Sequence, residues 1–132
     1  MTSRSFLRLS AALVLCTVAA TASSATQTSI RGIYSSLRYN SEGGDLLGME
    51  LLILPGHGDS EWTVVAQIAE GGAPCVSVAS LRVTGENVEF TLPKEGQCGE
   101  IHLRGKLTGQ DLEFKAGFEQ IEHLKRGKSY WQ

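Results

Sequence analysis

Side chains suited to acid–base or metal chemistry are sparse in this 132-residue sequence. The segment 57–61 (HGDSE) places an imidazole and two carboxylates within five residues, a composition that suits a metal ion. Zinc sites, however, need three or four fixed ligands, and the segment lacks the ligand spacing of a calcium loop. His102 alternates with charged neighbours as on a solvent-facing strand, and His123 lies in a charged C-terminal region. We therefore predict a solvated turn at 57–61, no metal site and no cofactor.

Motifs of nucleophilic catalysis and phosphate binding are absent from the sequence. It contains no Gly-x-Ser-x-Gly, no His-Glu-x-x-His and no Cys-x-x-Cys. These patterns would place a nucleophile, two zinc ligands or a redox pair. The glycine pairs at 43–44 and 71–72 fit turns rather than phosphate-binding loops. The sequence therefore predicts a protein that is not an enzyme.

Two groups of residues are candidates for binding. The C-terminal segment is basic and then aromatic, and such residues are frequent at the centres of protein interfaces. Four carboxylates at predicted turns could form a rim that attracts a cation or a basic partner. The candidate partner-binding residues are Lys125, Arg126, Lys128, Tyr130 and Trp131, and the candidate rim residues are Glu42, Asp45, Glu70 and Glu95.

Residues 1–25 have the order of regions that is typical of a secretory signal peptide. Arg4 and Arg8 precede a mostly apolar run over 9–20, and small residues follow. The run is shorter than the roughly 20 residues of a membrane-spanning helix. Cleavage after Ala22 or Ala25 fits the small residues that signal peptidase requires. We expect a periplasmic or secreted protein with no membrane span.

The three cysteines fall on both sides of the expected cleavage site. Cys16 follows the large residue Leu15, whereas a lipoprotein attachment site needs a small residue there, so we do not expect a lipoprotein. Cys16 leaves with the signal peptide, and 107 or 110 residues remain with Cys75 and Cys98 as an even pair. In an exported domain such a pair predicts one disulfide, which here closes a ring of 24 residues.

Period-two alternation broken by glycine-bearing turns runs through residues 26–132 and predicts a single all-β domain, an antiparallel up-and-down meander. In this meander the start of the fourth strand and the loop after the fifth meet at one end, which brings Cys75 to Cys98. An eighth strand near 120–126 would pair with the first and close a small barrel, because an up-and-down sheet must hide its edges. The alternative for 119–126 is a helix, because Phe118, Ile121 and Leu124 are spaced like one helix face. The seven other strands are expected at 33–39, 47–53, 62–68, 75–84, 88–92, 101–107 and 112–118.

Bulky residues at alternate positions predict a mostly filled barrel interior. A second apolar set, Leu46, Leu52 and Leu54, points outward and would be covered by the C-terminal tail or by a second copy in a homodimer. The residues expected inside are Ile33, Leu37, Leu47, Met49, Leu51, Ile53, Trp62, Val64, Ile68, Phe90, Leu92, Ile101, Leu103, Phe114 and Phe118.

The charge balance limits the partners. Twelve basic residues face 14 acidic ones, and losing the two leader arginines leaves a formal net charge of −4, which argues against nucleic-acid binding by bulk charge. The Gly32-x-Tyr34 start, the glycine-punctuated meander and the single disulfide together resemble small exported barrels such as avidin-like and lipocalin-like proteins. The resemblance is one of architecture, and no functional residue is carried over.

The function expected from these features is non-catalytic binding of a small ligand or a polymer. The alternative is a protein-partner role, such as an inhibitor of a secreted hydrolase that acts through the loops at the disulfide end. An apolar pocket of several hundred Å³ would favour the ligand, whereas a filled barrel with protruding rim loops would favour the protein partner.

Overall fold

The computed structural model describes residues 29–58, 61–116 and 120–132. The predicted signal peptide, with Cys16, lies outside the described residues, and so do Asp59 and Phe118. Nine strands make up the regular structure of the described part. They are β1 (Gly32–Ser35), β2 (Arg38–Asn40), β3 (Asp45–Pro55), β4 (Trp62–Glu70), β5 (Cys75–Thr84), β6 (Asn87–Leu92), β7 (Ile101–Thr108), β8 (Asp111–Ala116) and β9 (Gln120–Gly127).

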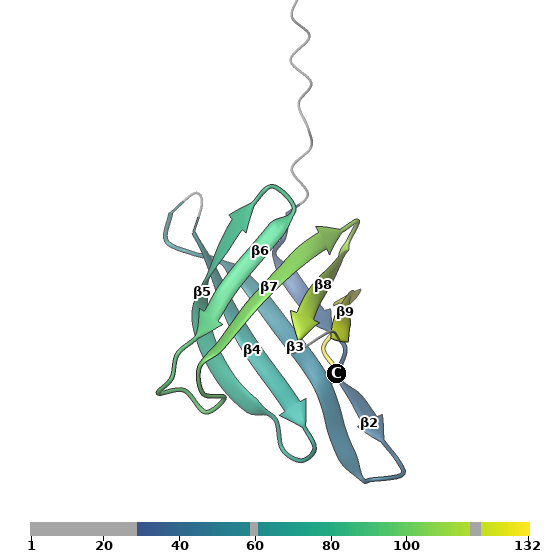
Figure 1. The fold of residues 1–132 in the computed structure, drawn as a ribbon. Helices are drawn as coiled ribbons and strands as arrows, with labels where there is room; N and C mark the ends of the chain where they lie inside the picture. Colours follow the sequence, from purple (N-terminus) through teal and green to yellow (C-terminus); the bar gives the residue numbers. More distant parts are fainter. Residues whose placement is uncertain (1–28, 59–60, 117–119) are drawn as a thin grey trace, which may run out of the picture.

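The strands form one antiparallel sheet that closes into a barrel (Figure 1). Each strand from β3 to β9 pairs with the next, and β1 pairs with both β3 and β9. β1 and β2 keep one register against β3, with Tyr34 opposite Leu51 and Arg38 opposite Leu47, so they act as one interrupted strand. With β1 and β2 counted as one strand, the barrel has eight strands, and the predicted all-β up-and-down barrel is confirmed.

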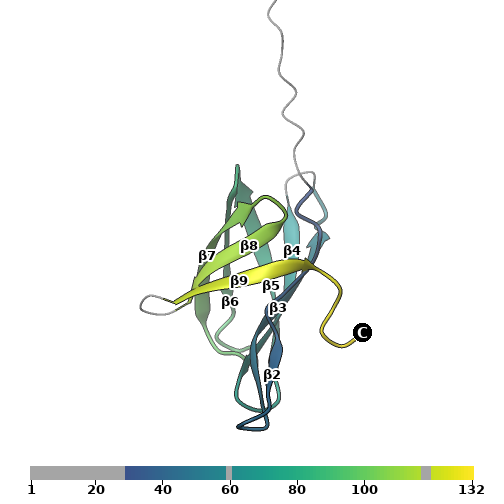
Figure 2. The same cartoon turned by 90° about the vertical axis from the view of Figure 1, so that its right-hand side faces the viewer.

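The last strand settles the alternative left open at 119–126. Gln120–Gly127 is a strand, not a helix, and its residues Lys125, Arg126 and Gly127 pair with β1. The β2–β3 hairpin continues past the point where β1 leaves β9, so it projects from one end of the barrel (Figures 1 and 2). In the part of the chain that the structure describes, no helix has the length and apolar character to cross a membrane.

Large side chains fill the barrel interior. Phe90 and Phe114 meet edge to face with their ring centroids 5.7 Å apart. Leu51, Ile53 and Leu92 are fully buried around this pair, in one continuous cluster contributed by every strand except β2. The interior is therefore a packed core, as the bulky alternating residues predict.

One inward face is predicted wrongly. In β1 it is Tyr34, not Ile33, that lies inside, and its side chain is 0% exposed. Its hydroxyl donates to the carbonyl of Ile30 at 2.8 Å, and the guanidinium of Arg126 lies 5.7 Å from its ring centre. These contacts satisfy the phenol in the interior, where burial raises its pKa. Leu37 consequently lies on the outside.

The predicted disulfide between Cys75 and Cys98 is confirmed, with the two Cα atoms 5.2 Å apart. It ties the start of β5 to the β6–β7 loop, and Gln97 of that loop accepts a hydrogen bond from the backbone N–H of Val76. Closing a ring of this size stabilises the fold by about 3 kcal/mol in the chain-entropy model. The disulfide thus fastens the loop at the end of the barrel from which the β2–β3 hairpin projects.

Gly48 lies opposite the break between β1 and β2. Its φ is +102°, and a Cβ atom there would lie 2.6 Å from the carbonyl oxygen of Ser36. Only glycine permits this conformation and this approach without strain. Gly85, in the β5–β6 turn, has a φ of +61° but open space around its Cα atom.

We predict that Gly48→Ala lowers the free energy of unfolding by about 3 kcal/mol or more, whereas Gly85→Ala costs about 1 kcal/mol. The two losses differ because both variants strain the backbone, but only Gly48→Ala also places a Cβ atom against the Ser36 carbonyl. Urea unfolding of the two variants measures both losses. Equal losses in the two variants would show that the close approach of β3 to Ser36 is unimportant.

Candidate functional site

Because the interior is packed, the candidate sites lie on the outside of the barrel. There, one row of branched apolar side chains crosses four strands: Ile33 is paired with Leu52, Leu52 with Val65, and Val65 with Val78. Val78 is 55% exposed. We call this surface the outer apolar face. It consists of Ile33, Leu52, Leu54, Val65, Val76 and Val78, together with Tyr130 and Trp131 of the C-terminal tail.

The C-terminal tail is held against this face by Glu50. Although it lies on the outer side of β3, Glu50 is only 4% exposed. Its carboxylate accepts a hydrogen bond from the Ser129 hydroxyl at 2.6 Å and one from the backbone N–H of Tyr130 at 2.7 Å. The Trp131 indole N–H donates to Gln67 of β4 at 2.9 Å. The tail thus turns back from β9 onto β3 and β4 (Figure 2).

The predicted partner-binding residues of the tail divide into two groups. Lys125 forms an ion pair with Asp111 at 3.2 Å, and the Arg126 guanidinium donates to the carbonyl of Arg31 at 2.7 Å. Both are therefore engaged in closing the barrel. Lys128, Tyr130 and Trp131 are exposed, and the two aromatic rings meet edge to face.

The outward leucines also divide. Leu46 is buried beside Leu37 and Ala69 in a small cluster of its own, so it is not available to a partner. Leu52 is half-buried, and Leu54 is 43% exposed. The tail covers Glu50 rather than Leu54, which leaves part of the outer apolar face open.

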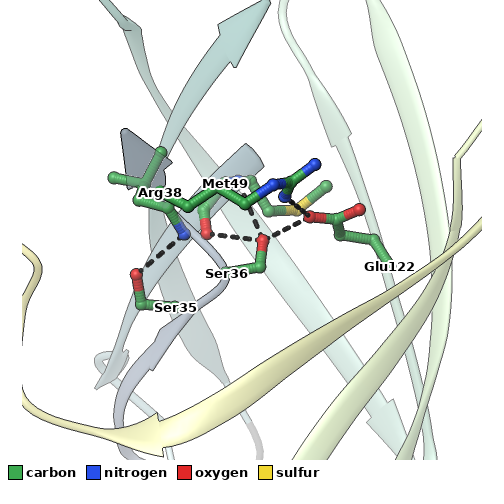
Figure 3. Close-up of polar contacts among 6 residues, drawn as sticks. Ser35, Ser36, Arg38, Met49 and Glu122 are labelled. Atoms are coloured by element: carbon green, nitrogen blue, oxygen red, sulfur yellow. Dashed lines mark hydrogen bonds and ion pairs between the residues drawn. The ribbon is translucent and has the colours of Figure 1, made fainter. Parts of the chain in front are cut away.

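Side chains complete the barrel where the β1–β9 ladder stops. Beyond Ser35 the backbones of β1 and β9 part, and the Ser36 hydroxyl donates to the carboxylate of Glu122 (Figure 3). The same carboxylate lies 3.7 Å from the guanidinium of Arg38, and Ser36 also accepts a hydrogen bond from the N–H of Met49. This cluster joins Ser36 and β2 to β3 and β9, so it holds the barrel together where the backbone pairing of β1 and β9 stops.

The candidate rim residues lie at the disulfide end. Glu42, Glu70 and Glu95 are exposed, and Asp45 lies beside the β4–β5 turn, whose Gly71 N–H donates to the carbonyl of Leu46. Among residues 29–58, 61–116 and 120–132, no three histidine, cysteine, aspartate or glutamate side chains lie close enough together to hold a metal ion.

A hydroxyl, an imidazole and a carboxylate are hydrogen-bonded in series on the outer face of β6 and β7. His102 Nε2 lies 3.1 Å from Glu89, and its Nδ1 lies 2.7 Å from the Thr91 hydroxyl. This order can activate a hydroxyl nucleophile. The imidazole and the carboxylate, however, are 47% and 36% exposed, and water screens the electrostatic stabilisation that catalysis requires. The array is better suited to binding a ligand through hydrogen bonds.

The buried Glu50 and the Thr91–His102–Glu89 array are two features that the sequence pattern does not reveal. Glu50 stands at an outward position of an alternating strand, where a carboxylate is ordinary. The array depends on cross-strand register, which local patterns do not reveal. No family model matches the chain, and neither a curated protein nor a solved structure matches it.

We predict that Glu50→Ala releases the tail, because it removes the acceptor of two hydrogen bonds. The indole N–H of Trp131 should then exchange with solvent faster. The free energy of unfolding should fall by about 1.5–3 kcal/mol. Hydrogen exchange followed by NMR and urea unfolding measure these effects. Glu70→Ala, at an exposed position, is the control and should change stability by less than about 0.5 kcal/mol. Unchanged exchange at Trp131 in Glu50→Ala would show that Glu50 does not hold the tail.

We predict a pH-dependent contribution from Asp111. The backbone N–H of Arg126 and the ammonium of Lys125 lower its pKa in the folded protein. Its stabilisation is therefore complete above the unfolded pKa of about 3.9 and is lost as the pH falls through the lower folded pKa. The stability difference between the wild type and Asp111→Asn should shrink on going from pH 7 to pH 2 in urea unfolding. A difference that is constant with pH would contradict this role.

Proposed function

We propose that this chain is an exported, non-catalytic binding protein whose partner is another protein that docks on the outer apolar face. The observation that carries the proposal is the distribution of exposed apolar side chains. Of the seven large apolar residues that are exposed in the described part of the chain, five lie on this face: Leu54, Val76, Val78, Tyr130 and Trp131.

A protein fits this surface better than a small ligand does. One continuous hydrophobic cluster fills the middle of the barrel. The hollow at its disulfide end, lined by Ile68, Cys98 and Ile101, is open and measures about 270 Å³, which is less than a typical ligand pocket. A contiguous apolar surface with a polar rim is typical of protein-binding sites, and Trp and Tyr are enriched among the residues that contribute most to binding. Lys128, which precedes the aromatic pair in the chain, is exposed and supplies one polar group of such a rim.

Export is supported by the residue pattern of positions 1–25 and by the disulfide. Disulfides persist in oxidising compartments and are rare in the cytosol of most organisms. The Cys75–Cys98 bond joins two loop-adjacent positions that carry no Cys-x-x-Cys motif, so a structural role outside the cytosol explains it better than a redox role.

A second docking mode, inhibition of a secreted hydrolase through the disulfide end, is favoured by the projecting β2–β3 hairpin. Tyr39 on this hairpin is 61% exposed and is followed by the acidic loop residue Glu42. An exposed aromatic side chain on a protruding hairpin has the shape to enter an active-site cleft. Tyr39 is a single exposed apolar side chain, however, whereas the outer apolar face has five such side chains.

The experiment uses the protein as cells process it. The full-length chain is expressed in its source cells, recovered from periplasm or culture fluid, and used to capture partners from the same fluid. We expect one protein to bind the wild type and Ile121→Glu but to bind Val78→Glu at least about tenfold more weakly, because a charge in the centre of an apolar interface is costly. Ile121 is the matched control because it is 52% exposed on β9, outside the outer apolar face.

Several outcomes would contradict the proposal. Retention of the chain in the cytosol with an intact N-terminus would exclude export. Equal binding by Val78→Glu and the wild type would exclude the outer apolar face, and loss of binding in Tyr39→Ala alone would place the partner on the β2–β3 hairpin. Sedimentation of the wild type as a dimer that Val78→Glu dissociates would identify a second copy as the occupant.

A further inference from the structure

A hollow adjoins the outer apolar face and shares Val78 with it. It is an open groove of about 1030 Å³ over the outer side of β5, β6 and β7, and Gly56 and His57 of the segment after β3 form one wall. Figure 1 shows this segment standing beside β5. Apart from Val78, its lining lies outside the outer apolar face, so a ligand in the groove does not require the proposed protein partner.

A row of hydroxyl and imidazole side chains crosses the groove. Thr63 of β4 is paired with Ser80 of β5, and Thr91 of β6 is paired with His102 of β7. Neighbouring strands lie about 4.8 Å apart, so the row presents a hydrogen-bonding group at regular steps comparable to the length of one sugar ring. The side chains of Thr63 and Ser80 make no hydrogen bond to another residue that the structure describes, whereas Thr91 and His102 are bonded to each other.

The charges in the groove largely cancel. Arg82 lies opposite Glu89 in the β5–β6 ladder, and the carboxylate of Glu89 is bound by Arg104 and His102. Glu61 adds one further negative charge to the lining. A polyanion therefore gains little from this site, and a polycation would compete with bonds that are already made. The lining favours a neutral ligand rich in hydroxyl groups.

The lining of the groove also has an apolar part, next to the hydroxyl row. Val78 and Pro93 are both exposed at the level next to the hydroxyl row. They can contact the C–H face of a sugar while the hydroxyls of the sugar reach the polar row. Side chains of this mixed kind, apolar surface with a few placed polar groups, are typical of ligand sites.

An extended peptide fits the groove less well. Peptides that bind sheets usually add a strand to a free edge. The barrel is closed by the β1–β3 and β1–β9 pairings, so the groove has no free edge on its floor. A ligand must therefore be recognised through side chains. We propose that this groove binds a linear, neutral glycan along the row from Thr63 to His102.

The test is a titration of the ¹⁵N-labelled mature protein with three neutral hexasaccharides: cellohexaose, chitohexaose and maltohexaose. We expect saturable chemical-shift changes at Ser80, Thr91 and His102 with at least one of them. Thr91→Val and Ser80→Ala should each weaken that binding about five- to tenfold, the effect of losing one hydrogen bond. Thr108→Val, an exposed threonine at the β7–β8 turn outside the groove, should bind as the wild type does.

Other outcomes would overturn the proposal. They are the absence of saturable shifts with all three sugars, shifts confined to residues outside the groove, and tighter binding of a heparin hexasaccharide than of any neutral sugar. An equal loss of affinity in Thr108→Val and Thr91→Val would also exclude the hydroxyl row as the binding element. Circular dichroism of each variant shows whether the barrel is intact, and Thr91→Ser, which keeps the hydroxyl, should restore binding if Thr91→Val does not fold.

Discussion

Pairing of β1 with both β3 and β9 is the constraint on which the other features of the molecule depend. It covers edges of β3 and β9 that would otherwise invite another strand. It also encloses a continuous core from strands that are individually short and only half apolar. Tyr34 stands at the centre of this closure: its hydroxyl bonds to the segment before β1, and its ring lies under Arg126 of β9. Tyr34 therefore belongs both to the core and to the contact between β1 and β9 that closes the barrel.

Because the barrel is closed and its middle is filled, the surfaces that a partner could reach are on its outside. Because side chains alternate along each strand, residues at one level of neighbouring strands form rows, and each row has its own chemistry. The row through Val65 and Val78 is apolar, and the next row, through Ser80 and Thr91, is rich in hydroxyls. Two neighbouring surfaces of different chemistry can in this way be built from the same strands, one suited to a protein and one to a polar ligand.

Local sequence pattern predicts the strands up to β8, the turns and the disulfide, because alternation, glycine and cysteine act over short distances. At 119–126 the local pattern fits a helix as well as a strand, and the strand is favoured because the sheet must hide its edges. It assigns the wrong face to β1, because a tyrosine that finds an acceptor inside the barrel is as acceptable there as the isoleucine next to it. Glu50 could not be predicted for a related reason. Its burial depends on Ser129 and Tyr130, which lie at the far end of the chain. Functional features that depend on register across strands are invisible until the register is known.

We expect the separation along the chain between the two halves of the closure to set an order for folding. The disulfide joins positions within one neighbourhood, and the hairpins from β3 to β8 need only adjacent segments, so they can form early. The contact of Tyr34 with Arg126 needs nearly the whole chain, and contacts of such long range are the slow ones. Until β9 arrives, β1 has one unpaired side and Glu50 has no tail to cover it. The last eight residues of the sequence are thus the ones that end the period in which the sheet is open to another chain.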